Sequence, residues 1–270
     1  MEQQRKYGFI ESPKDLRDYK LDNKVFKSMA LPSEFRVEHS RIKDQGMVNS
    51  CVAHSISEIL ETKDGINYST GWIYGYRPFG YHQGEGMVTS QALKTVHKVG
   101  YLTNEELDVN VEMMAAKEIV DKSLAVYMDK AKARKIVSYA RLNTINEIKQ
   151  AIYTANKPVL VAIKIGENGL ELNKKYVAYI PKGYSGGHQL VCYGWNETGL
   201  LIQNSWGENW GDKGTFILPY EYPIAEAWLI NFEGDPKNQG LEVIKPNLFI
   251  FRELLMKIIK FFRNLFKKGE

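Results

Sequence analysis

The sequence predicts an α+β fold of two halves, and three observations lead to this prediction. Residues 31–133 carry apolar side chains at helical spacing, and residues 134–235 carry short β-branched and aromatic runs. The composition, 44% hydrophobic and 25% charged over 270 residues, excludes a disordered chain, a collagen-like repeat and a disulfide miniprotein. A helical half followed by a β half predicts a functional cleft between them.

The helical half follows a polar and charged segment, residues 1–30, which we interpret as an N-terminal arm. Its elements are predicted as a helix over 49–63, a loop over 68–86, a helix over 90–99 and one or two helices within 104–133. The first of these helices has apolar residues at helical spacing, and Asn49 or Ser50 can cap it. Gly100 ends the second helix.

The β half consists of short runs bounded by turn residues. Strands are predicted over 135–142, 158–165, 188–195, 199–206, 214–219 and 227–232. One helix, over 146–156, interrupts them.

Charge and cysteine content limit the function classes. The net charge of +4 is too small to indicate a nucleic-acid partner, and two cysteines, Cys51 and Cys192, do not make a disulfide framework. The chain starts without a secretory signal pattern and has no apolar run of membrane-spanning length, so we expect a cytoplasmic protein. Metal-ligand and phosphate-loop motifs are absent from the sequence, so no metal and no cofactor are expected.

Cys51 occupies the first turn of the helix predicted over 49–63. Unpaired backbone N–H groups and the helix dipole favour negative charge there, so a thiolate is favoured over a thiol. The alternative interpretation is a small buried hydrophobic residue, which is the commonest role of a lone cysteine. The surrounding motifs decide between the two.

Three motifs recur in a fixed order along the chain: QGMVNSCVA at 45–53, GGHQLV at 186–191 and NSWGENWG at 204–211. They resemble the motifs of the papain-like cysteine peptidases, which carry a catalytic Cys, then a His that opens a strand, then Asn-Ser-Trp-Gly. Cys51 and His188 are 137 residues apart (188 − 51), within the roughly 130–150 typical of that family. The resemblance covers about residues 31–232 and implies a helical left domain and a β-barrel-like right domain with the active-site cleft between them.

The resemblance and the chemistry assign the same roles. Cys51 is the expected nucleophile, and His188 takes its proton to form a thiolate–imidazolium pair. Asn204 accepts from the far ring nitrogen of the histidine and fixes its orientation. The side-chain amide of Gln45 and the backbone N–H of Cys51 form the oxyanion hole, and Trp206 covers the His–Asn pair. This predicts an endopeptidase that acts through a thioester acyl-enzyme.

The substrate is expected to be a polypeptide held along the cleft. Gly86, with Glu85 and Met87 on either side, lies by resemblance in the loop that pairs with an extended substrate, and Gly187 adjoins the histidine. The stretch 220–227 is expected to form one wall of the pocket.

The chain departs from the family pattern around the nucleophile. Val48 stands where the family usually has a disulfide cysteine, and Val52 replaces the usual Trp. Cys192 lies in a strand-like run and is interpreted as a structural thiol. Because the disulfide cysteines of the family are not evident, the stability of the fold must come from packing. We expect residues 1–25 to form a short arm that lies in or near the cleft and regulates access.

The C-terminal extension, residues 236–270, contains a predicted basic amphipathic helix. Apolar residues follow one helix face and Lys and Arg the other within 248–268. Such a helix is suited to an anionic membrane surface or to a groove on a partner protein. Docking on the body of the same protein, or pairing with a second copy, is equally compatible with the pattern.

Two alternatives to the peptidase stay open. One keeps the fold and changes the acceptor, giving a thiol acyl transferase or an amidase. The other is a catalytically silent binding scaffold, which gives no reason to retain Cys51, His188, Asn204 and Gln45 together.

Overall fold

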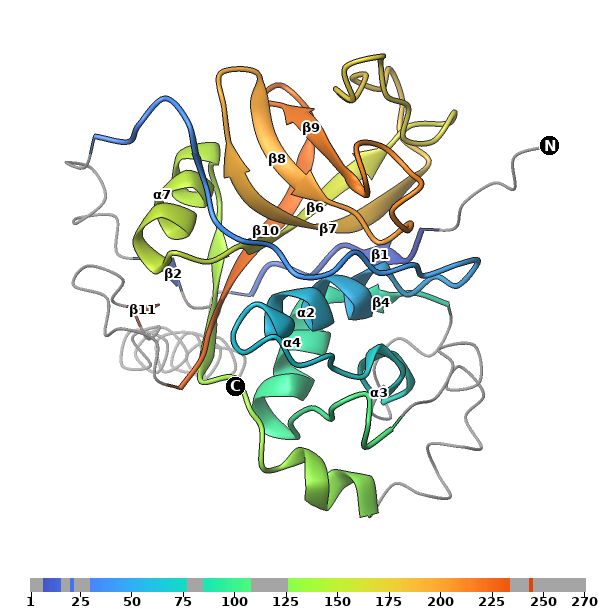
Figure 1. Ribbon diagram of the computed structural model, residues 1–270, viewed down its shortest axis with the longest axis vertical. Helices are drawn as coiled ribbons and strands as arrows, with labels where there is room; N and C mark the ends of the chain where they lie inside the picture. The colour runs from blue at the N-terminus through green and yellow to red at the C-terminus, as the bar shows by residue number, and fades with distance from the viewer. Residues whose placement is uncertain are drawn as a thin grey trace, which may run out of the picture.

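The computed structural model describes residues 7–15, 20–21, 30–76, 85–107, 126–233 and 243–244. Within these residues a mostly helical half lies against a half built on a β-sheet, as the sequence predicts (Figure 1). The two halves meet along α2 (Cys51–Glu61), which packs against the middle of the sheet. This contact brings the predicted nucleophile to the junction between the halves.

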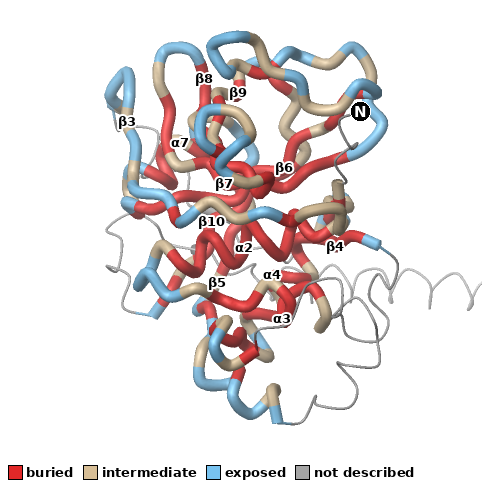
Figure 2. The backbone as a smooth tube through the Cα atoms, turned by 45° about the vertical axis from the view of Figure 1, so that its right-hand side comes forward, coloured by how far each residue is buried: buried red, intermediate tan, exposed pale blue. Residues whose placement is uncertain are grey.

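The helical half is organised around α2, all of whose residues are buried (Figure 2). α3 (Thr70–Gly75) and α4 (Thr89–Lys98) pack on it, and residues 126–131 are also helical. The prediction of a loop over 68–86 is wrong at α3. Its residues are weak helix formers, but the Ser69 hydroxyl caps the Trp72 N–H at 3.1 Å, and the indole of Trp72 is buried in the core.

The β half contains the six predicted strands. They are β5 (Ser138–Leu142), β6 (Val159–Ile165), β7 (Gly186–Trp195), β8 (Gly199–Gln203), β9 (Thr215–Pro219) and β10 (Ile224–Asn231). Three short strands join them, namely β2 (Lys20–Leu21), β3 (Phe35–Arg36) and β11 (Val243–Ile244). The order within the described residues is β11-β2-β5-β10-β6-β7-β8-β9, and β3 pairs antiparallel with the end of β7.

The middle of the sheet is buried on both faces, which explains the continuous apolar run of β6. Leu160 belongs to the core shared with α2, whereas Val159 and Val161 belong to the core under α7 (Ile145–Ala155). The same alternation in β7 separates Val191 from its neighbours. β7 is therefore held rigidly between two cores, and it is the strand that carries His188.

Local signals set the ends of α7 as predicted. The Thr144 hydroxyl accepts the Glu147 N–H at 3.1 Å, and Asn156 ends the helix in the left-handed conformation with φ 51°. Among the described helices, none combines the length and the apolar character that a membrane crossing requires. The helix predicted within 248–268 and most of those predicted within 104–133 lie outside the described residues.

Candidate active site

Cys51 is the first residue of α2, and Ser50 is its N-cap. The thiol lies against β7, because the backbone N–H of Gln189 points at Sγ from 3.5 Å. Two further bonds fix this contact between the halves. Ser55 Oγ donates to the Gln189 carbonyl at 3.0 Å, and Thr89 Oγ1 donates to the Gln189 side chain at 2.7 Å. The residue that follows His188 in the chain is thus bonded to both α2 and the start of α4.

His188 is fully buried, and its ring orientation is fixed by Asn204. Nε2 lies 2.8 Å from Asn204 Oδ1. The same oxygen accepts the Ser205 backbone N–H at 2.8 Å, which identifies it as the amide oxygen. Nε2 of His188 therefore carries the hydrogen, and Nδ1 is the nitrogen that can accept a proton. Nδ1 has no hydrogen-bond partner among the described residues.

Trp206 covers the His–Asn pair, as expected from its position after Asn204. Its indole stacks on the His188 imidazole with centroids 4.8 Å apart and an angle of 24°. With Trp206 only 3% exposed, the stack keeps water away from the hydrogen bond between Nε2 and the amide.

Gln45 is tied to the segment that carries Asn204. Its Oε1 accepts from Ser205 Oγ at 2.8 Å, and its backbone N–H donates to the Ser205 carbonyl at 2.9 Å. Nε2 donates to the Val48 carbonyl at 2.8 Å, within the turn that leads to Cys51. These bonds orient the carboxamide and hold it next to the helix N-terminus.

Residues 7–15 of the N-terminal arm cross the site between the two halves (Figure 1). β1 (Phe9–Ile10) pairs in parallel with β4 (Met87–Val88), and the Met87 N–H donates to the Gly8 carbonyl at 2.8 Å. The Gly8 N–H faces the Cys51 sulfur and lowers the pKa of its thiol. Gly8 thus presents its N–H to the predicted nucleophile and directs its carbonyl to β4.

The four predicted substrate-binding residues lie along the arm. A Cβ on Gly86, whose φ is +88°, would lie 2.6 Å from the Gly8 carbonyl oxygen, and a Cβ on Gly187 would lie 2.4 Å from the ring of Phe9. Met87 makes the backbone bond described above. Glu85 accepts a hydrogen bond from the side chain of Asn49, whose carbonyl oxygen would lie 2.0 Å from a Cβ on Gly8.

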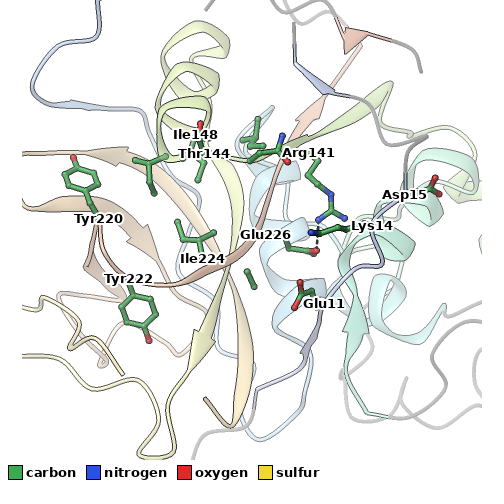
Figure 3. A pocket seen from close by; sticks show the side chains of 14 residues that line it. Glu11, Lys14, Asp15, Arg141, Thr144, Ile148, Tyr220, Tyr222, Ile224 and Glu226 are labelled. Atoms are coloured by element: carbon green, nitrogen blue, oxygen red, sulfur yellow. Dashed lines mark hydrogen bonds and ion pairs between the residues drawn. The ribbon is translucent and has the colours of Figure 1, made fainter. Parts of the chain in front are cut away.

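Ser12 anchors the other end of the arm to both halves. Its N–H and Oγ donate to the two carboxylate oxygens of Glu226 at 3.1 and 2.9 Å, and Oγ accepts the Ser90 N–H at 3.0 Å. Arg141 pairs with the same carboxylate at 3.3 Å and also lines an adjoining cavity of about 510 Å³ (Figure 3). Glu226 lies in the stretch 220–227, which we expected to form a wall of the substrate pocket.

Burial controls the charge state of the covered site. It raises the pKa of the Cys51 thiol to about 11, against the N–H groups of Gln189 and Gly8, which lower it. It lowers the pKa of His188 to about 4, and the bond to Asn204 opposes this shift. The expected thiolate–imidazolium pair is therefore a neutral thiol and a neutral imidazole while the arm is in place, because desolvation outweighs the helix N-terminus.

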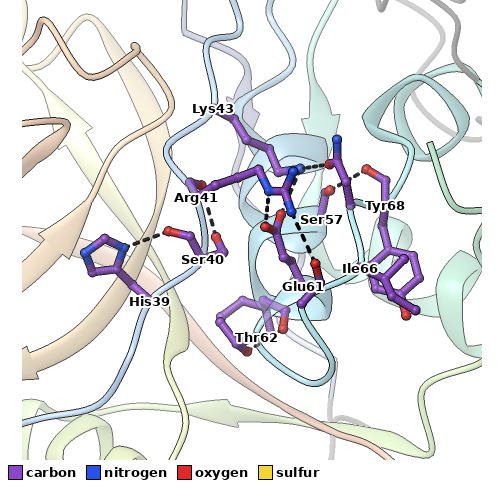
Figure 4. Close-up of polar contacts among 12 residues, drawn as sticks. His39, Ser40, Arg41, Lys43, Ser57, Glu61, Thr62, Ile66 and Tyr68 are labelled. Carbon is purple, nitrogen blue, oxygen red and sulfur yellow. Dashed lines mark hydrogen bonds and ion pairs between the residues drawn. The ribbon is translucent and has the colours of Figure 1, made fainter. Parts of the chain in front are cut away.

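A charged cluster lies at the far end of α2 (Figure 4). Lys43 pairs with Glu61 at 3.3 Å, and Arg41 pairs with the same carboxylate. Burial raises the pKa of the neighbouring Glu58 to about 8, against the charge of Lys43, which lowers it. Glu58 and Glu61 belong to the C-terminal end of α2, whereas Cys51 lies at its N-terminal end, so this cluster is separate from the cysteine site.

The fold and the site define the class first. A cysteine at a helix N-terminus in one half lies against a strand of the other half that carries a His–Asn pair, which is the arrangement of a two-domain cysteine peptidase. Residues 32–223 match the family described as papain family cysteine protease, and the chain belongs to this family. It is a hydrolase whose substrates are polypeptides.

Individual relatives agree in length as well as in sequence. An uncharacterized peptidase C1-like protein of Acanthamoeba polyphaga mimivirus is 24% identical over 86% of this chain and 88% of its own. Mexicain from Jacaratia mexicana is 28% identical over 64% of this chain and 79% of its own. The crystal structure of xylellain, a cysteine protease from Xylella fastidiosa, superposes with a TM-score of 0.71 at 23% identity, covering 86% of this chain and 99% of xylellain.

Sequence reasoning missed the residues that join the halves and the arm. Gln189 and Ser205 lie inside two of the motifs but their bonds were not predicted, and Glu226 lies in no motif, because the partners of all three are distant in sequence. The arm had one signal: residues 7–10, YGFI, form a short apolar run with a glycine inside an otherwise charged segment. Cys192, interpreted as structural, is fully buried in β7, and its thiol donates to the Gly194 carbonyl at 3.4 Å.

Proposed function

We propose that the protein is a cysteine endopeptidase in which Cys51 attacks the peptide carbonyl and His188 moves the protons. The observation that supports this most is the state of the imidazole. Nε2 of His188 is hydrogen-bonded to Asn204, and Nδ1 has no hydrogen-bond partner among the described residues. The next residue of the same strand, Gln189, points its backbone N–H at the Cys51 sulfur. An imidazole held in this way accepts a proton at one nitrogen only.

The reaction follows in balanced steps. The Cys51 proton passes to Nδ1 of His188 while sulfur bonds to the carbonyl carbon, and the oxyanion accepts hydrogen bonds from the Gln45 carboxamide and the Cys51 N–H. When the C–N bond breaks, His188 returns the proton to the leaving amine and a thioester remains. Water then loses a proton to the same nitrogen, attacks the thioester and releases the acid and the thiol.

We also propose that the arm, residues 7–15, holds the enzyme inactive. A substrate must present a carbonyl carbon to the sulfur, with its oxygen toward Gln45. The arm instead offers the Gly8 N–H to the sulfur and gives the Gly8 carbonyl to Met87. The peptide bond that the arm places over Cys51 is therefore not positioned for attack by the sulfur, and the covered thiol stays protonated.

A thiol-directed label tests the catalytic proposal. The full chain is treated with a peptidyl epoxide and the modified residue is located by mass spectrometry. We expect label on Cys51 and none on Cys192, which is also fully buried but lies away from a helix N-terminus, with its thiol donating to the Gly194 carbonyl. Cys51→Ala is expected to abolish labelling and cleavage of a peptide library, and Cys192→Ala is the matched control. A folded chain without residues 1–15 that takes no label at Cys51 would indicate a scaffold.

Product analysis separates the peptidase from an acyl transferase. Cleavage in water gives a free carboxylate, whereas transfer to an added amine gives an amide. Amide as the main product at millimolar amine would contradict the hydrolytic assignment. Deletion of residues 1–15 tests the arm, since the truncated chain should label faster than the full chain. An equal labelling rate in the two folded proteins would exclude an inhibitory arm.

A further inference from the structure

The side chain of Tyr7 fills a pocket next to the catalytic imidazole. Its ring meets the edge of His188 with centroids 5.6 Å apart at 73°, and it meets Trp206 at 5.8 Å and 56°. Aromatic pairs prefer such tilted and edge-on arrangements. The walls of this pocket are therefore fixed by the same stack that holds the histidine in place.

The closed end of the pocket is shaped for a phenolic hydroxyl. The Leu170 backbone N–H faces the Tyr7 oxygen and lowers the pKa of this hydroxyl, against burial, which raises it by more. Gly169 lies beside that oxygen with φ +87°, and a Cβ there would stand 2.8 Å from it. A hydrogen bond from Gly169 N–H to the Gly166 carbonyl at 3.0 Å fixes this turn. The end thus supplies a donor and the space for one oxygen atom beyond the ring.

The position of the pocket identifies the part of a substrate that enters it. His188 must return a proton to the leaving amine, so the residue that follows the scissile bond lies over the imidazole. The acyl half lies on the other side of Cys51, along Met87 and Gly86. Tyr7 precedes Gly8, yet it occupies the place of the residue after the scissile bond. The arm therefore runs in the opposite direction to a substrate while filling the same pocket.

We propose that the pocket formed by Trp206, Leu170 and Gly169 binds a tyrosine side chain at the first residue after the scissile bond. The enzyme then cleaves Xaa–Tyr bonds in preference to bonds before small residues. This inference rests on the proposed peptidase function and adds its specificity on the leaving side. Phenylalanine fills the same walls but leaves the Leu170 N–H without its acceptor.

The test compares quenched fluorescent peptides that differ only in the residue after the scissile bond, with Tyr, Phe and Ala in turn. The full chain is used, because an arm that covers the site lowers all three rates by one factor and leaves their ratios unchanged. We expect kcat/KM for Tyr to exceed that for Ala by about tenfold to a hundredfold, from burial of the ring. Tyr should exceed Phe by about two- to tenfold, from one hydrogen bond.

Two glycine variants test the hydroxyl end. Gly169→Ala puts a methyl group 2.8 Å from the position of the oxygen, closer than packing allows, and it should remove the preference of Tyr over Phe. Gly183→Ala, in the same loop, has only a Glu167 carboxylate oxygen at 4.0 Å from the new Cβ and should keep the wild-type ratio. The Phe peptide reports whether each variant folds, and Tyr7→Phe should raise every rate by one factor without changing the ratios.

The outcomes separate the two claims. Cleavage of all three peptides at equal kcat/KM overturns the inference and leaves the peptidase in place, with a pocket that serves the arm alone. A Tyr-to-Phe ratio unchanged in Gly169→Ala overturns the hydroxyl site. If no peptide is cleaved by the folded, arm-deleted chain, the proposed function fails and the inference fails with it.

Discussion

Gly8→Ala is predicted to open the covered active site. Gly8 is the arm residue whose N–H faces the Cys51 sulfur, and the Cβ of an alanine there would stand 2.0 Å from the Asn49 carbonyl oxygen. Non-bonded carbons pack at about 3.5–4.0 Å, so the two segments must separate by roughly an ångström or more. The Asn49 side is braced by the turn before α2, where Ser50 N–H donates to Val48 O at 2.8 Å. We therefore expect the arm to move.

The magnitude follows from the cost of overpacking. Inserting one methyl group into a packed contact costs about 1–3 kcal/mol. This cost includes the loss of the hydrogen bond from Met87 N–H to Gly8 O when the arm is displaced. At about 1.4 kcal/mol per tenfold, the uncovered fraction rises by about fivefold to a hundredfold. In the covered state a thiol with a pKa of about 11 is ionised in roughly one molecule in three thousand at pH 7.5. Reaction thus proceeds almost entirely through uncovered molecules.

The assay is the rate at which iodoacetamide modifies Cys51 at pH 7.5, followed by mass spectrometry, together with peptide hydrolysis by the same samples. Both rates should rise by one factor in Gly8→Ala. Gly186→Ala is the matched control, because its new Cβ has no atom within 4 Å. A folded Gly8→Ala protein with the wild-type alkylation rate would refute the reasoning, since it would mean that the arm does not limit access to the thiol.

Three further predictions concern other contacts. Asn204→Ala should lower kcat by about 10- to 1,000-fold with little change in KM, because His188 loses the acceptor that fixes its tautomer; an unchanged kcat would contradict this role. Ser12→Ala should raise hydrolysis by the full chain by about tenfold or more, because the arm loses a bond to the buried Glu226 carboxylate; a rate equal to that of the wild-type full chain would contradict this role. Glu58→Gln should change the pH dependence of unfolding in denaturant. The folded-state pKa of Glu58 is raised, so its contribution to the free energy of unfolding is fully present below about pH 4.5 and is lost as pH rises to about 8. The variant lacks this pH-dependent loss, and parallel plots of unfolding free energy against pH for the two proteins would contradict the prediction.

Several elements were predictable because their causes are local. α2 follows from apolar spacing within one segment, and the strands from β5 to β10 follow from short apolar runs between turn residues. The site residues Cys51, His188 and Asn204 could be named because their motifs occur in a characteristic order. The hydrogen bond from Ser55 to Gln189 joins residues 134 positions apart in the two halves, so no local sequence pattern could predict it.

The arm shows the limit most clearly. β1 and β4 have two residues each, too few for any periodicity, and their pairing depends on Gly86 and Gly187 leaving room for Gly8 and Phe9. Complementarity between surfaces distant in the chain has no signature in either segment alone. The sequence led to the expectation of an arm in or near the cleft, but not to the contacts that hold residues 7–10 there.

The sequence by itself determined which side chains can carry the chemistry, because residue identity fixes the donors, acceptors and nucleophile. Only the tertiary structure decided their state. A thiol at a helix N-terminus is expected to ionise, but burial raises its pKa to about 11, against the neighbouring N–H groups, which lower it. Solvation belongs to the assembled surface and not to a residue type, so the covered, protonated form of Cys51 could be recognised only with both halves and the arm in place.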